Sequence, residues 1–134
     1  MAADARRIGT PFQQSLGLRW TMDDGGSVAV ELGMRDDLRG PAGSLEGGVV
    51  STLADVAGAS AAALAVGSLV ATEHISISFL APGRVGPIRA TGVPLRVGRQ
   101  DAVAEVRIVD AGKGDRLMAV ALVTVRVLAE RRPD

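Results

Sequence analysis

The sequence contains no cysteine and only one histidine, His74. Without cysteine there is no disulfide framework, no thiolate nucleophile and no Cys-based metal site. A single histidine excludes a multi-histidine zinc site and, with cysteine absent, a Cys–His dyad. These absences remove several common catalytic classes before any motif is considered.

Aromatic residues are also scarce, at 2% of the chain, so a core must rest on Val, Leu, Ile and Ala. The longest apolar run, residues 56–66, is interrupted by Gly58 and Ser60 and is too short to span a bilayer. Residues 1–12 lack the apolar stretch of a secretory signal. We therefore expect a soluble, cytoplasmic protein with no membrane partner.

No excess of charge of either sign is present, with 15 basic and 15 acidic side chains. No basic run or aromatic platform points to nucleic acid, so we expect no nucleic-acid partner. The 134 residues contain no linker, low-complexity segment or repeat. The chain fits one domain, 1–134, long enough for a core that folds unaided.

Hydrophobic periodicity predicts strands on both sides of one helix. Residues 16–22 alternate apolar and polar side chains, 23–26 form a turn signal, and 27–34 alternate again. Alternation stops over residues 45–66, where alanine and leucine predict a helix buried on nearly all sides. Four further strands are expected at 72–80, 88–98, 102–110 and 116–128. Short connections favour antiparallel pairing around the helix, an α+β domain. A short helix is also expected at 3–8.

The expected helix begins with Gly47 and Gly48 and carries one carboxylate, Asp55, inside its apolar run. A helix N-terminus presents free N–H groups and the positive end of the macrodipole, and glycine lets a carbonyl oxygen approach. Such donors can hold a developing oxyanion. A carboxylate such as Asp55 could attack an acyl carbon or deprotonate a water.

Gly47 and Asp55 cannot serve one substrate from the same helix. Eight residues separate them by about 12 Å along the axis, whereas both must lie about 3 Å from the reacting group. Two antiparallel copies of the helix would bring Gly47 of one chain to Asp55 of the other, in two equivalent sites. The helix's small residues suit close approach by another backbone.

Simpler interpretations of these residues stay open. Glycines before a helix are commonly turn residues, and the Asp55 side chain could be satisfied by Ser51 or Thr52, one helical turn earlier.

"GPAGSLEGG", "VVST" and "LADVAGASAA" follow one another around the expected helix, and "TEHISISFLAPGRVG" comes next. These segments resemble the helix and the following strand of hotdog-fold thioesterases of the phenylacetate-degradation (PaaI-like) and 4-hydroxybenzoyl-CoA thioesterase group. "LRVGRQDAVAEVRIVDAGKGDRLMAVALVTVRVL" resembles the closing strands, and "LGLRW" extends the match towards the start. The resemblance implies a hotdog fold, an antiparallel sheet of about six strands wrapped around one long central helix.

The resemblance also implies hydrolysis of an acyl-CoA or aryl-CoA thioester by homodimers that usually pair into homotetramers. It implies no metal and no cofactor, since coenzyme A is part of the substrate. Asp55 matches the carboxylate nucleophile or general base, and Gly47 matches the N–H donor to the thioester oxygen. Gly48 lies beside that donor. Thr72 matches a position that helps to hold the attacking water.

Two positions depart from the family pattern: Gly40 stands where the family has Asn, and Glu46 where it has His. Gly40 offers no side-chain donor. Glu46 could orient a water, or act as a base with Asp55 as the nucleophile. Alternatively, it is only an acidic residue at the positive end of the helix.

The remaining candidates are peripheral. We expect Trp20 and Phe79 in the core, although Phe79 could border an acyl pocket, and His74 at a surface or interface. Cations in the expected turns could meet CoA phosphates; they are Arg84, Arg99 and Lys113.

Two rival functions follow from the same residues. Gly40 and Glu46 favour a non-catalytic hotdog protein that binds acyl-CoA or an acyl carrier, or only assembles. A hotdog dehydratase or hydratase ranks last, because its usual motif is missing around His74.

Overall fold

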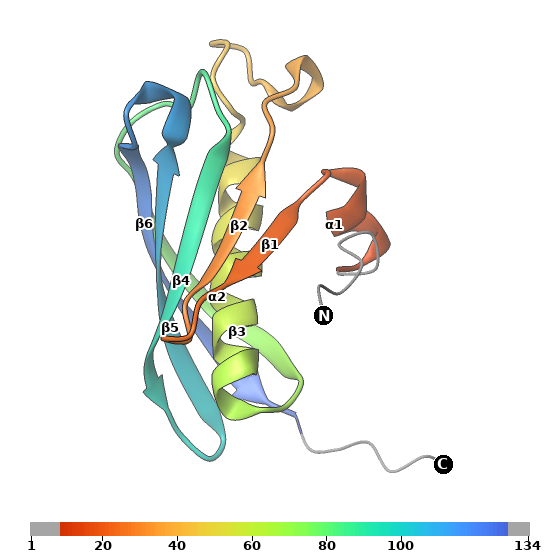
Figure 1. The fold of residues 1–134 in the computed structure, drawn as a ribbon, viewed down its shortest axis with the longest axis vertical. Coiled ribbons are helices and arrows are strands. Elements are labelled where there is room, and N and C mark those ends of the chain that lie inside the picture. Colours follow the sequence, from red (N-terminus) through yellow and green to blue (C-terminus); the bar gives the residue numbers. More distant parts are fainter. Residues whose placement is uncertain (1–8, 129–134) are drawn as a thin grey trace.

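The structure, a computed structural model, describes residues 9–128 (Figure 1). A short helix, α1 (Pro11–Ser15), precedes two strands, β1 (Arg19–Met22) and β2 (Val28–Leu32). The long helix α2 (Gly47–Val66) follows, and then the remaining four strands: β3 (Val70–Phe79), β4 (Ile88–Val97), β5 (Asp101–Asp110) and β6 (Arg116–Val127). The helix expected at 3–8 lies outside the described residues.

All six strands form one antiparallel sheet, in the order β1-β2-β4-β5-β6-β3. The sheet curves around α2, which contacts every strand from β2 to β6 (Figure 1). The order places β1 and β3 at the two edges. This is the predicted α+β hotdog fold, with the predicted number of strands.

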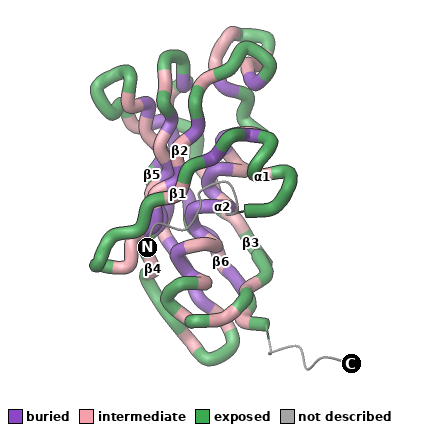
Figure 2. The backbone as a smooth tube through the Cα atoms, turned by 45° about the vertical axis from the view of Figure 1, so that its right-hand side comes forward, coloured by how far each residue is buried: buried purple, intermediate pink, exposed green. Residues whose placement is uncertain are grey.

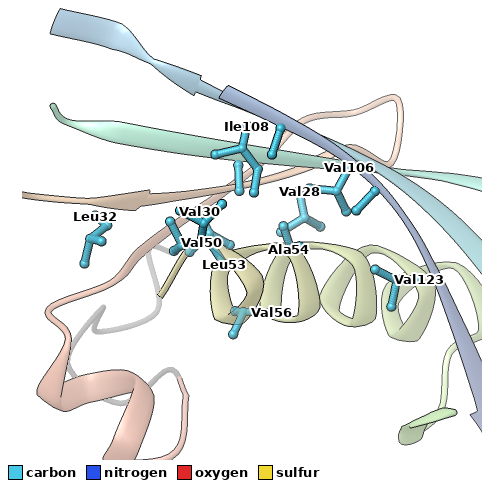
Figure 3. Packing of buried hydrophobic residues seen from close by; sticks show 14 of the residues in the cluster. Val28, Val30, Leu32, Val50, Leu53, Ala54, Val56, Val106, Ile108 and Val123 are labelled. Atoms are coloured by element: carbon cyan, nitrogen blue, oxygen red, sulfur yellow. The ribbon is translucent and has the colours of Figure 1, made fainter. Parts of the chain in front are cut away.

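The core lies between α2 and the concave face of the sheet. Side chains of β2, β5 and β6 alternate between buried and less buried positions, and Leu53 and Ala54 of α2 face them (Figure 3). At Gly58 an added Cβ would lie 2.6 Å from Val123, and at Gly92 it would lie 2.3 Å from the Ala57 carbonyl oxygen. These two glycines therefore let α2 sit directly on β6 and β4.

The composition predicted that α2 is buried on nearly all sides, and this prediction was wrong. Its sheet-facing residues are buried, whereas Gly47, Gly48 and Leu64 are exposed and Asp55 is half-buried. Figure 2 colours the chain by this burial. α2 has the length and apolar composition of a membrane-spanning helix. Here it packs onto the sheet as a core helix, and part of its remaining surface, including Leu64, is exposed in the single chain.

Two further expectations were wrong. The strand expected at 16–22 begins only at Arg19, because Leu16 caps α1 and its buried side chain belongs to a turn. Phe79 is not a core residue, since it is 55% exposed near the end of the edge strand β3. Trp20 is half-buried and packs against the core.

Candidate active site

The N-terminus of α2 presents backbone donors at the surface. Glu46 is the N-cap residue, without a side-chain cap, and its carbonyl accepts from the N–H groups of Val49 (2.9 Å) and Val50 (3.1 Å). Gly47 and Gly48 precede these first intrahelical donors, so the helix itself cannot satisfy their N–H groups. Both glycines are exposed.

Gly47 lines a pocket of about 330 Å³ together with Phe79, Leu80 and Met118. The Phe79 ring would lie 3.8 Å from a Cβ added at Gly47, so an aromatic side chain stands beside the Gly47 Cα. The structure thus brings two predicted residues together. The pocket walls are largely apolar, which strengthens a hydrogen bond made there.

Two loops hold this end of α2. Leu45 N–H donates to the Gly83 carbonyl and Glu46 N–H to the Leu38 carbonyl, both at 2.9 Å. The Arg39 guanidinium bridges the loops, donating to the carbonyls of Gly43 (2.7 Å) and Arg84 (3.2 Å). The position of the Gly47 N–H therefore depends on the segment 81–87 as well as on the helix.

Segment 81–87 is itself anchored by Asp110, the buried charged residue at the end of β5. Its carboxylate accepts from the N–H groups of Arg84 (2.8 Å), Val85 (3.1 Å) and Gly86 (2.7 Å). Burial opposes ionisation of Asp110, but these donors and that of Gly112 outweigh it, and the pKa lies below its usual value. An ionised carboxylate therefore fixes the loop beside the Gly47 pocket.

Asp55 lies two turns further along α2 and accepts a 2.6 Å hydrogen bond at Oδ1 from Thr72 Oγ1. The simpler interpretation of its partners was wrong. Ser51 Oγ and Thr52 Oγ1 donate to the carbonyls of Gly47 (3.0 Å) and Gly48 (2.9 Å) instead. A carboxylate held by one hydroxyl keeps free lone pairs for a water or a substrate.

A β-bulge explains how Thr72 reaches the helix. Thr72 pairs with Val125 of β6, and His74 pairs with the next residue, Thr124, so Glu73 is extra. Val125 is buried against the helix, which places Thr72 on the same face. Regular alternation from Ile75 would have turned Thr72 outwards. The bulge turns the Thr72 side chain towards α2.

Asp55 borders its own pocket, of about 260 Å³, separate from that of Gly47. Thr52 and Val56 of α2 and Ile75 of β3 line it, and α1 contributes Phe12 and Gln13. Sequence reasoning assigned no role to Phe12 or Gln13. The available signal was an aromatic side chain directly after Thr-Pro, which is typical of a helix start.

The other predicted residues divide between the two ends of the molecule. Gly40 begins the turn before α2. Arg84, in a loop, and Lys113, in the 3-10 helix η3 (Ala111–Lys113), lie at this same end, where Ile88 pairs with Asp110. Arg99 lies in the turn at the far end of β5. Ten strand residues span about 33 Å, so one chain cannot bring Arg99 and Arg84 to the same phosphate.

A larger hollow, of about 400 Å³, lies on the sheet face turned away from α2. Ser76, Glu105, Arg107 and Leu122 line it, and none of the predicted site residues does. His74 is exposed on β3, as expected of a surface position. The chemistry of the candidate site therefore lies with the two pockets on α2.

A six-stranded hotdog fold with exposed helix N–H donors and a carboxylate on the same helix defines a thioesterase-type scaffold. The sequence model of the Thioesterase superfamily matches residues 42–117, which include both pockets' residues on α2. The chain belongs to the Thioesterase superfamily. This confirms the predicted family.

Individual relatives agree with this assignment. A 1,4-dihydroxy-2-naphthoyl-CoA hydrolase of Listeria monocytogenes serotype 1/2a (strain 10403S) is 26% identical over 123 residues, 90% of this chain and 98% of that protein. The crystal structure of S. sahachiroi AziG is 31% identical, with a TM-score of 0.81, covering 91% of this chain and 98% of that one. The E. coli PaaI protein of the phenylacetic acid degradation operon shares the fold, at 23% identity and a TM-score of 0.82, covering 90% of this chain and 86% of that one.

Proposed function

We propose that this protein hydrolyses acyl-CoA thioesters, aryl-CoA esters among them, in a site built by two antiparallel copies of α2. The observation that carries the proposal is that the Thr72-held Asp55 carboxylate and the free Gly47 N–H occupy separate pockets of one chain. A two-fold axis between helices would join the two pockets. The Listeria relative, a hydrolase of an aryl-CoA ester, supports the substrate class.

In this site the Gly47 N–H, with Gly48 beside it, binds the thioester carbonyl oxygen and the oxyanion that forms from it. Asp55 of the partner subunit takes a proton from water as the water attacks the acyl carbon. The new C–O bond forms, the C–S bond breaks, and the coenzyme A sulfur leaves with a proton as the free thiol. Alternatively, the partner subunit's Asp55 attacks first and water cleaves the resulting anhydride. Thr72 holds the carboxylate in either case.

Further binding roles follow from position. Phe79 stands beside the donor and would contact the acyl group or the pantetheine arm. Arg84 and Lys113 lie at the same end of the sheet, where they would meet CoA phosphates, and Arg99 would reach such a phosphate only in a different copy. Dimers of dimers are part of this proposal.

The direct test is a hydrolysis assay over a panel of CoA esters, with Asp55→Asn and Asp55→Ala beside wild type. We expect turnover by wild type and a loss of about 10²–10⁴-fold in both variants, the range of a positioned acid–base group. Unchanged rates in the variants, or no turnover of any ester by wild type, would remove the enzymatic proposal.

A second candidate is a non-catalytic protein that binds acyl-CoA or acyl carrier thioesters. The exposed Glu46 favours it, because a carboxylate next to the Gly47 donor opposes a developing oxyanion. Gly40, which cannot supply a side-chain donor, points the same way. Calorimetric binding of CoA esters without turnover would select this candidate.

A further inference from the structure

The helix α1 forms a wall of the pocket that contains Asp55. Phe12 of α1, Val56 of α2 and Ile75 of β3 give this pocket an apolar lining beside the carboxylate. Val56 lies on the side of α2 away from the sheet (Figure 3), yet it is only 6% exposed. Residues of α1 and α2 thus lie together around this pocket.

This short helix is held firmly for its length. Its N-cap, Thr10, forms a capping box with Gln13, in which Gln13 N–H donates to Thr10 Oγ1 (3.2 Å) and Thr10 N–H to Gln13 Oε1 (3.0 Å). At its other end the Ser15 carbonyl accepts from Arg35 Nη1 (2.9 Å), and Leu16 is buried in the core. These contacts hold the backbone of α1, and with it the point from which the Phe12 side chain projects, before any ligand binds.

Phe12 itself is 60% exposed, so residues 9–128 leave much of its aromatic ring uncovered. Phe12 and Asp55 line the same pocket, so a ligand held there beside the carboxylate would contact this large apolar side chain. An acyl group whose carbonyl carbon lies at Asp55 has this ring within its reach. A flat ring stacks on a second aromatic ring better than a flexible chain does, and it loses less conformational freedom on binding.

We propose that Phe12 is a specificity-determining residue, whose ring contacts the acyl group and favours a flat aromatic acyl group over a flexible chain of equal carbon number. This rests on the proposed function, because it takes Asp55 as the reacting carboxylate. It adds a residue from outside the motif around α2 and a reason why α1 is built onto the fold.

The test compares kcat/KM for benzoyl-CoA and heptanoyl-CoA, whose acyl groups have seven carbons each. We expect wild type to prefer benzoyl-CoA. Phe12→Ala and Phe12→Leu should lower the preference about two- to tenfold, the range of one aromatic contact, whereas Phe12→Tyr, which keeps the ring, should retain it. Met22→Ala is the matched control, since Met22 is also 60% exposed but lies on β1 and outside the pocket.

An equal loss for both esters in Phe12→Ala, or no change in their ratio, would overturn the assignment. So would a wild type without the aromatic preference, or a change of oligomeric state in Phe12→Ala by sedimentation, which would make Phe12 an interface residue. If wild type cleaves neither ester, the proposed function fails for them. In that case, calorimetry with the non-hydrolysable thioether analogues of both esters tests Phe12 by the ratio of the two binding affinities. If neither analogue binds, the proposal for Phe12 is overturned.

Discussion

The two pockets on α2 differ in the groups that they offer to a ligand: backbone N–H groups in one and side chains in the other. At the Gly47 pocket the proposed reactive groups are backbone N–H groups, and two loops hold them in place through Arg39 and Asp110. At the Asp55 pocket the lining consists of side chains from three separate elements, α1, α2 and β3. A backbone N–H donor is retained in most substitutions of its own residue, whereas a side-chain group is removed when its residue is replaced. The two halves should therefore fail in different ways.

The sharpest way to break the backbone half is Gly47→Pro. Proline at the first helical position removes the N–H and suits the helix start, and Glu46 already has the extended backbone, φ −61° and ψ 138°, that proline requires before it. We expect kcat of the thioesterase reaction to fall about 10²–10³-fold, as when one oxyanion donor is lost.

Gly47→Ala is the control, because it keeps the N–H and its Cβ would lie 3.8 Å from the Phe79 ring, an ordinary contact. It should keep kcat within a few-fold of wild type. A Gly47→Ala enzyme as slow as Gly47→Pro, with both folded by circular dichroism, would contradict a role for the N–H.

Mixed dimers test whether the halves come from different chains. A heterodimer of Gly47→Pro and Asp55→Ala chains, purified through two different tags, retains one intact site if each site uses Gly47 of one chain and Asp55 of the other. We expect it to recover about half of the wild-type rate per dimer, from two nearly inactive parents. A heterodimer as inactive as its parents would show that each site lies within one chain.

The same contrast explains what the sequence could predict. Strand alternation and the apolar run at 45–66 predicted six strands and α2, because burial on one face sets the period of two. The helix-start glycines and Asp55 were visible as a local pattern. The exposed part of α2, the exposure of Phe79 and the place of α1 in the Asp55 pocket were not, since each depends on segments distant in sequence. The bulge at Glu73 was also hidden, because nothing in the alternation of 74–78 announces an extra residue.

Asp110 tests how much the loop beside the Gly47 pocket depends on one buried carboxylate. Asp110→Asn replaces an ionised acceptor of several N–H groups with an amide, and we expect the free energy of unfolding at pH 7 to fall by about 3 kcal/mol. Because the folded-state pKa of Asp110 is lowered, its ionisation stabilises the protein above the unfolded-state pKa. That stability is lost as pH falls through the folded-state value, so the two proteins should converge below about pH 4. Urea unfolding of both between pH 7 and 3 measures this, and a difference independent of pH would contradict it.

Thr72 gives the smallest expected effect on the side-chain half. Thr72→Val keeps the shape of the side chain but removes the 2.6 Å hydrogen bond to Asp55, and we expect kcat to fall about tenfold, as for one hydrogen bond to a charged group. Thr72→Ser should stay close to wild type.

Deleting Glu73 tests the bulge, because Thr72 would still pair with Val125 and face α2 in a regular strand. The ion pair between Glu73 and Arg126 is exposed and contributes little to stability. The deletion should therefore leave kcat nearly unchanged, and a loss as large as that of Thr72→Val would mean that the extra residue itself holds the Thr72 hydroxyl on Asp55.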